Sequence, residues 1–144
     1  MPLGVSFVYI FAPKTKSLGF NNRLLLPLIG WLGFCTVLLT IPGDSLPSER
    51  WLNIPHLDKY IHIFLFAVMT VLMSRWLLKK GIPYHRDKLY IVICGLIALG
   101  YGIGMEYVQK YWVPLRSFDY TDIIADGVGA ILGVVITVFY YLKH

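Results

Sequence analysis

The run of sequence that decides the fold lies near the end of the chain. Residues 123–142 read IIADGVGAILGVVITVFYYL, which contains one acid and no base. A helix of about 20 mostly apolar residues can cross a hydrocarbon core of roughly 30 Å. Three further stretches qualify: Leu24–Ile41, about Tyr60–Leu78 and about Leu89–Tyr107. Because backbone N–H and C=O groups cannot stay unpaired in lipid, the sequence predicts an all-α, polytopic membrane protein, a four-transmembrane-helix bundle.

The composition supports this class. Of the 144 residues, 57% are apolar and only 15% are charged, against roughly 25% charged in an ordinary soluble domain. A net charge of +5 would suggest nucleic acid in a soluble protein, but here the bases flank apolar runs, so we expect no nucleic-acid partner. Cys35 and Cys94 both lie inside apolar runs, which gives neither a disulfide framework nor a CxxC metal site.

The four stretches form one expected domain, residues 24–142, preceded by a segment of a different kind. Within residues 1–23, Val5–Ala12 is apolar but too short to span a membrane. It lacks the basic start and the cleavage site of a signal peptide. We therefore expect an N-terminal cytoplasmic or interfacial segment.

Basic residues predict the orientation, because they are enriched on the cytoplasmic side. Nine of them lie on the side that carries both termini, and four lie on the other. Both termini are therefore predicted to be cytoplasmic. Seven of the eight acids belong to the opposite, extracytoplasmic side, and only Asp87 is cytoplasmic.

Polar side chains gather at three of the expected helix ends on that outer side. At the start of the second helix, Asp58 and His62 are four residues apart and share a face, with Lys59 beside them. Near the end of the third helix, Glu106 and Gln109 are three apart.

The third and fourth helices add a glycine row to their polar face. The Glu106 face continues through Gly102 and Gly95, and the face of Asp122 and Asp126 continues through Gly129 and Gly133. Such rows let helices approach closely in lipid. We expect these two faces to pack together and to carry their polar residues to a shared outer-leaflet site, to which the loop Lys110–Thr121 adds Arg116 and Asp119.

Several of these residues also have purely structural interpretations. Asp58 and Asp122 could be N-caps of their helices. Lys59 could anchor the helix at the lipid headgroups, and His62 could be a neutral core histidine that is hydrogen-bonded to Asp58.

The remaining polar residues have such interpretations too. Glu106 could form a structural ion pair with Arg116 or Lys59. Asp126 lies a full turn inside its helix, too deep for a cap, and could hydrogen-bond to a neighbouring helix. Arg116 could simply grip lipid phosphate.

Taken in order, these residues resemble the signatures of the VanZ-like membrane proteins. The first signature is the run DKYIHIF at residues 58–64. The second comprises EYVQ at residues 106–109, PLRSFD at residues 114–119, and then Asp122, Asp126, Gly129 and Gly133. One departure is Asp126, where the family often has asparagine. The resemblance implies a small bacterial inner-membrane protein of a family linked to resistance to the glycopeptide teicoplanin, with work on or near the cell envelope.

Our main hypothesis is an outer-face site that binds, or processes, an anionic envelope lipid or a lipid-linked cell-wall precursor. Lys59 and Arg116 would hold the phosphate. His62, oriented by Asp58, could act as a general base or nucleophile, and Glu106 could act as a general acid. The other candidate binding residues are Gln109, Asp119, Asp122 and Asp126.

Three alternatives stay open at this point. The excess of acids over bases could be balanced by a divalent cation, although no recognised metal spacing is present. The protein could be a non-enzymatic scaffold or accessory subunit whose polar network fixes helix packing. An ion-coupled transporter is a third class, but the acids cluster at one membrane face and form no relay across it. Whether any bond is broken, and the oligomeric state, are left open.

Overall fold

The computed structural model describes residues 23–42, 56–79 and 86–141, and within them the chain is helical with no strand. There are four helices in these ranges: α1 (Leu25–Leu39), α2 (Leu57–Leu78), α3 (Asp87–Trp112) and α4 (Tyr120–Tyr141). The expected segment 1–23 lies outside the described residues apart from its last position. The all-helical prediction is confirmed.

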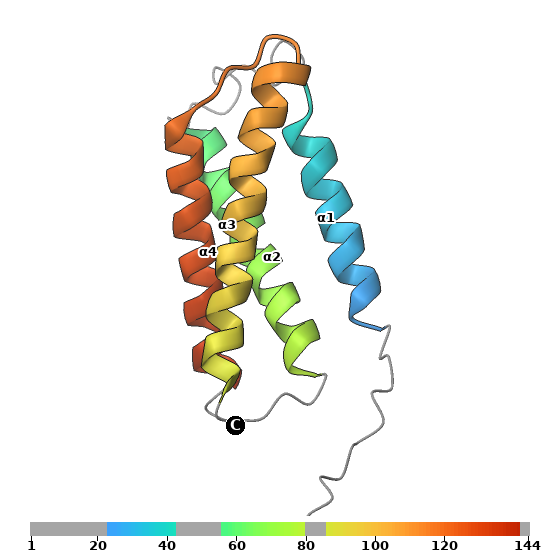
Figure 1. Ribbon diagram of the computed structural model, residues 1–144, viewed down its shortest axis with the longest axis vertical. Coiled ribbons are helices and arrows are strands. Elements are labelled where there is room, and N and C mark those ends of the chain that lie inside the picture. Colours follow the sequence, from blue (N-terminus) through green and yellow to red (C-terminus); the bar gives the residue numbers. More distant parts are fainter. Residues whose placement is uncertain (1–22, 43–55, 80–85, 142–144) are drawn as a thin grey trace, which may run out of the picture.

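The helices lie side by side in one elongated bundle, with α1 at its edge (Figure 1). Both α2 and α3 pack against α4 and against each other, whereas α1 packs against α2 and α3. Three helices, α2, α3 and α4, are long and apolar enough to cross a membrane. With 15 residues, α1 is only about 22 Å long at 1.5 Å per residue. It is therefore shorter than the predicted span Leu24–Ile41.

The three long helices extend beyond their apolar runs at the polar end. Helix α2 begins at Leu57 instead of Tyr60, and α3 continues to Trp112, five residues past Tyr107. The extra turns carry Asp58, Lys59 and Gln109. Hydropathy underestimates these helices because charged residues can continue a helix where they find partners in the bundle.

Glycines mark the closest approaches between helices. The prediction that the two glycine rows face each other was wrong. Gly129 and Gly133 of α4 face α2 and not the glycine row of α3. A Cβ added at Gly133 would lie 2.7 Å from the carbonyl oxygen of Ala67 and 2.6 Å from Cβ of Thr70. Two rows of glycines would leave a void between the helices, whereas a glycine row against Thr70 fills the space.

The α3 glycines do face α4, but opposite larger side chains. A Cβ at Gly95 would lie 2.9 Å from Cγ2 of Val134, and one at Gly102 would collide with the carboxylate of Asp126. The predicted contact between the third and fourth helices therefore exists, with side chains of α4 seated on glycines of α3.

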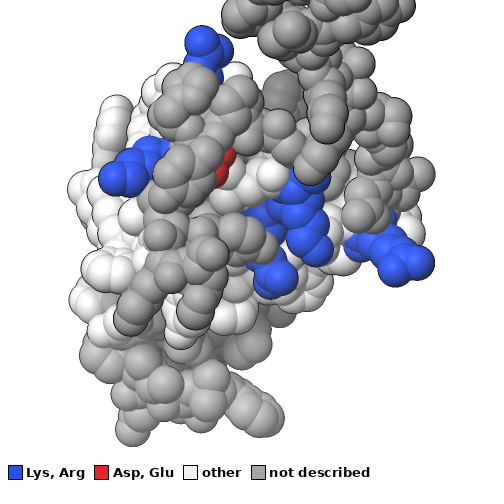
Figure 2. Space-filling model, turned by 90° about the horizontal axis from the view of Figure 1, so that it is seen from below, with Lys and Arg blue, Asp and Glu red and all other residues white. Residues whose placement is uncertain are grey.

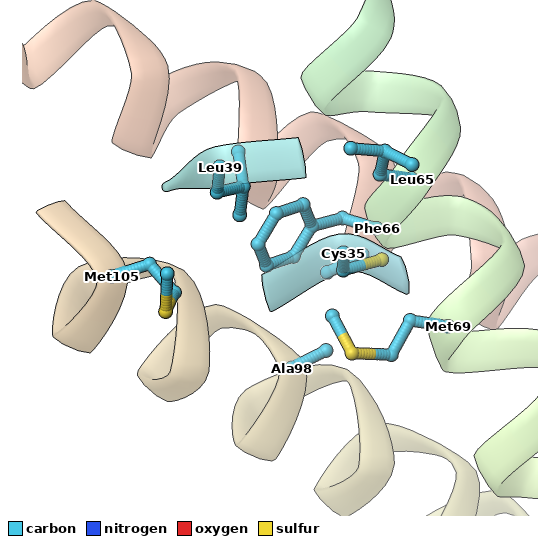
Figure 3. Close-up of a cluster of buried hydrophobic side chains, with 8 residues drawn as sticks. Cys35, Leu39, Leu65, Phe66, Met69, Ala98 and Met105 are labelled. Carbon is cyan, nitrogen blue, oxygen red and sulfur yellow. The ribbon is translucent and has the colours of Figure 1, made fainter. Parts of the chain in front are cut away.

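The apolar core is formed mainly by α1, α2 and α3 (Figure 3), and α4 contributes Ala130 to it. It is centred on Phe66, which is fully buried, and its members are Cys35, Leu39, Leu65, Phe66, Met69, Ala98, Met105 and Ala130. Cys35 and Cys94 are both buried and free. This core fixes the relative positions of the helices whose outer ends carry the polar residues.

Candidate functional site

The predicted polar residues come from the N-terminal ends of α2 and α4, the C-terminal end of α3 and the loop 113–119. These segments meet at one end of the bundle, where the loop from α3 to α4 crosses (Figure 1). Five polar side chains of this cluster are at most 5% exposed: His62, Glu106, Gln109, Asp122 and Asp126.

The opposite end of the bundle is basic (Figure 2). In the described residues the helix ends there carry Arg23, Arg75, Lys79, Arg86 and Lys88, with Asp87 as the acid. The charge asymmetry predicted from the sequence is thus present along the long axis of the bundle.

Lys59 is the centre of an ion-pair cluster that joins α2 to the start of α4. Its Nζ lies 2.9 Å from Oδ2 of Asp58 and 2.8 Å from Oδ2 of Asp119, and it also pairs with Asp122. Lys59 is only partly exposed, with 20% of its side-chain surface accessible. Three carboxylates therefore share its charge, which makes Lys59 a poor candidate for holding a ligand phosphate.

His62 pairs with Asp126 and not with Asp58 as predicted. Its Nδ1 lies 2.8 Å from Oδ1 of Asp126, and both side chains are buried. A carboxylate at Asp126 accepts the Nδ1 proton, which directs Nε2 toward Asp122, whose Oδ2 is 3.8 Å away. That distance is too long for a hydrogen bond. Asp58 instead stays half-exposed and pairs with Lys59, because its position one turn earlier lies at the surface.

Glu106 does not form the ion pair that was predicted for it. Its Oε2 accepts a hydrogen bond of 2.9 Å from the backbone N–H of Asp119, and the side chain is 1% exposed. Among the described residues neither Arg116 nor Lys59 pairs with it. Glu106 thus fixes the loop 113–119 on top of α3.

Two predicted ligand-binding residues contact the end of α1. Gln109 donates from Nε2 to the carbonyl oxygen of Leu39 at 2.9 Å, and Arg116 donates from Nε to that of Ile41 at 3.4 Å. Both acceptors lie at the C-terminal end of α1, where carbonyl groups have no partner within the helix. These contacts hold α1 against the polar end of the bundle.

Asp119 is the N-cap of α4, whereas the N-cap predicted as one possibility from the sequence was Asp122. Its Oδ1 accepts from the backbone N–H of Thr121 at 2.7 Å and from the Thr121 hydroxyl at 2.6 Å. The Lys59 ammonium and these Thr121 hydrogen bonds lower the pKa of Asp119 to about 2. The acid three residues later, Asp122, gives a spacing similar to a capping box, which could have identified the cap.

Two contacts in the bundle were missed by sequence reasoning. Trp31 donates from Nε1 to the carbonyl oxygen of Leu65 at 3.1 Å, and Thr36 and Tyr101 share a hydrogen bond of 2.9 Å between their hydroxyls. Nothing in the spacing of these residues pairs α1 with α2 or α3. Across the described ranges, no three His, Cys, Asp or Glu side chains are arranged to hold a metal ion.

Comparison with known proteins supports the family resemblance found in the sequence. A family model described as VanZ/LLP1 matches residues 1–141. An uncharacterized protein of Schizosaccharomyces pombe is 31% identical over 108 residues, which are 75% of this chain and 63% of the yeast protein. The chain therefore spans less than two thirds of that relative. No solved structure matches it significantly.

Proposed function

Because this chain belongs to the VanZ/LLP1 family and its helices make it a multi-pass membrane protein, we propose that it binds an anionic cell-envelope lipid, or a lipid-linked cell-wall precursor, at the polar end of the bundle. The bound phosphate group lies at the loop 113–119, above the buried acids. Family membership does not specify the ligand, so the ligand class rests on the chemistry of this end.

The observation that carries the proposal is the buried pair of His62 and Asp126. Ionisable residues inside a membrane protein are costly, and in general they mark functional sites. Asp126 orients the imidazole through Nδ1 at 2.8 Å, and Nε2 lacks a carboxylate within hydrogen-bond distance in the described residues. An imidazole held this way can accept a proton from a substrate or from water.

We assign the phosphate contact to Arg116 and not to Lys59. Lys59 is occupied by three carboxylates. Arg116 uses Nε on the Ile41 carbonyl oxygen, and within residues 23–42, 56–79 and 86–141 its terminal amino groups pair with no carboxylate. A guanidinium with these two groups available suits the oxygens of a phosphate.

In the proposed topology the chain lies in a bacterial inner membrane, with the polar end of the bundle on the extracytoplasmic side. The end of the bundle that carries the basic residues (Figure 2) is the cytoplasmic end in this proposal, as the positive-inside rule expects. Helix α1 serves as a fourth span in this arrangement, and Gln109 and Arg116 hold its C-terminal end at the polar end of the bundle. Both termini are then cytoplasmic.

Native mass spectrometry of the purified chain with added phosphatidylglycerol tests the proposal. We expect Arg116→Gln to lower lipid retention about tenfold, as for the loss of one charge-assisted hydrogen bond. Arg86→Gln, at the basic end, is the matched control and should retain the lipid. His62→Gln should keep the lipid, because the phosphate contact is assigned to Arg116. Equal retention by Arg116→Gln and by the unaltered chain contradicts the proposal.

A scaffold role is the second candidate, and the contacts to α1 favour it. The hydrogen bonds from Gln109 and Arg116 to the end of α1 serve assembly and need no ligand. In this case Gln109→Leu and Arg116→Gln should both lose thermal stability in detergent. Full stability of Arg116→Gln together with loss of lipid retention would exclude the scaffold role for that residue.

A further inference from the structure

The outer seam between α3 and α4 contains an apolar groove that lies outside the polar cluster. It has a volume of about 330 Å³ and is lined mainly by Val92, Leu96, Leu99, Gly127, Ile131 and Val134. Gly127 leaves space in this groove, because the nearest atom to a Cβ added there would be Cδ1 of Leu99 at 3.8 Å. It lies in the central part of two membrane-spanning helices, so it is exposed to the acyl chains of the lipids.

A second pocket lies on the same two helices at the polar end. Its volume is about 260 Å³, and its lining residues are Tyr107, Lys110, Phe118 and Tyr120. Phe118 packs between the two tyrosines, with ring centroids 5.3 Å from Tyr107 and 4.9 Å from Tyr120. Tyrosines at this level are typical of the membrane interface, where the phenol hydroxyl meets the headgroups.

Lys110 supplies a positive charge to this pocket. Its Nζ lies 6.0 Å from the ring centroid of Phe118 and 5.2 Å from that of Tyr111. Among the described residues it pairs with no carboxylate, in contrast to Lys59. A cation over aromatic rings keeps its charge available to an anion.

The pocket and the groove are aligned along one face. Leu99 and Tyr107 are eight residues apart on α3, and Tyr120 and Gly127 are seven apart on α4, which corresponds to about 10–12 Å along the helix axis. Spacings of seven and eight residues bring side chains back to the same helix face. A cationic, hydroxyl-rich pocket thus lies directly above an apolar groove, at the separation between a phosphate and the upper part of an acyl chain.

We propose that one phospholipid lies along this seam, with its phosphate at Lys110, Tyr107 and Tyr120 and one acyl chain in the groove beside Gly127. This deepens the proposed function and rests on it for the lipid class. The ligand that this site would recognise is a phosphate monoanion attached to an apolar chain.

The test uses the purified full chain and three probes: phosphatidylglycerol, diacylglycerol and glycerol 3-phosphate. Lys110→Gln should lower retention of phosphatidylglycerol about tenfold and leave diacylglycerol unchanged. Gly127→Phe should lower retention of both lipids because it fills the groove. The matched controls are Lys88→Gln at the basic end and Gly33→Phe on α1, where nothing lies within 4 Å of an added Cβ. Binding of glycerol 3-phosphate as tight as that of the lipid would overturn the lipid assignment.

Phosphatidylglycerol with a photoreactive acyl chain locates the site directly. We expect crosslinks on residues 92–99 and 127–134, reduced by Gly127→Phe and not by Gly33→Phe. Labelling spread evenly over all lipid-facing helices would overturn the inference. If Arg116→Gln keeps lipid retention while the seam variants lose it, the seam site stands and the proposed headgroup contact fails. The reverse pattern overturns the seam site alone.

Discussion

His62 of α2 and Asp126 of α4 share a hydrogen bond of 2.8 Å in the interior of the bundle. The backbone brings these two side chains together. Gly129, three residues after Asp126, lies so close to Ile63 that a Cβ would collide with the Ile63 carbonyl oxygen. The glycine row therefore does more than pack two helices, because it sets the distance at which the histidine meets its acid.

The first prediction concerns this hydrogen bond. Asp126→Leu leaves Nδ1 of the buried His62 without its acceptor and should lower the free energy of unfolding by about 1–3 kcal/mol. Asp126→Asn keeps an acceptor oxygen and should cost less. Both values can be measured by thermal unfolding in detergent. An equal loss for the two variants would show that the negative charge, and not the hydrogen bond, holds the pair.

The second prediction concerns the contact between α2 and α4. At Gly133 an added Cβ would lie 2.6 Å from Cβ of Thr70, so Gly133→Ala should force the helices apart and cost about 1–3 kcal/mol. Gly30→Ala on α1 is the matched control, since nothing lies within 4 Å of its added Cβ. The same thermal unfolding assay compares them. Similar melting temperatures for both variants would contradict the close contact.

The third prediction is a pH dependence from Asp119. Its pKa is lowered to about 2 in the folded chain, against about 3.9 for an unperturbed aspartate. A lowered pKa contributes stability above the unfolded value, and this contribution is lost as the pH falls from about 4 toward 2. Asp119→Asn should therefore flatten the fall in melting temperature over that range.

A companion variant separates the charge of Asp119 from its capping role. Asparagine remains a good N-cap, whereas Asp119→Ala also loses the cap and should cost about 1 kcal/mol more at neutral pH. If the asparagine and alanine variants behave alike at neutral pH, Asp119 does not cap α4. If the fall in melting temperature at acid pH is the same in Asp119→Asn as in the unaltered chain, the Lys59 contact does not lower the pKa of Asp119.

The helices and their polar ends could be predicted from the sequence because both depend on local patterns. A run of 20 apolar residues fixes a span, and positions three or four apart fix a face. The end at which Lys59, Glu106 and Asp122 gather followed from these two rules alone. Their local positions needed no information about the rest of the fold.

The partners could not be predicted, because a shared face does not identify what lies opposite. Asp58 and His62 are neighbours on α2, yet His62 turns inward to Asp126 while Asp58 pairs with Lys59. Contacts between different helices depend on how each helix is rotated about its axis and on how closely the helices approach. Gly129 and Gly133 set both for α4, because they lie directly against Thr70 and other residues of α2. Sequence spacing contains neither quantity.

The last prediction concerns orientation and uses the buried native cysteines. Cys35 and Cys94 are 0% and 1% exposed, so they should not react with a membrane-impermeant maleimide. Ser117→Cys places an exposed thiol in the loop 113–119, and Lys88→Cys places one at the basic end. Under the positive-inside rule, intact cells should label Ser117→Cys, while Lys88→Cys should require permeabilisation. The unaltered chain is the control for background. Labelling of Lys88→Cys alone in intact cells would show the opposite topology, with the acids and His62 toward the cytoplasm.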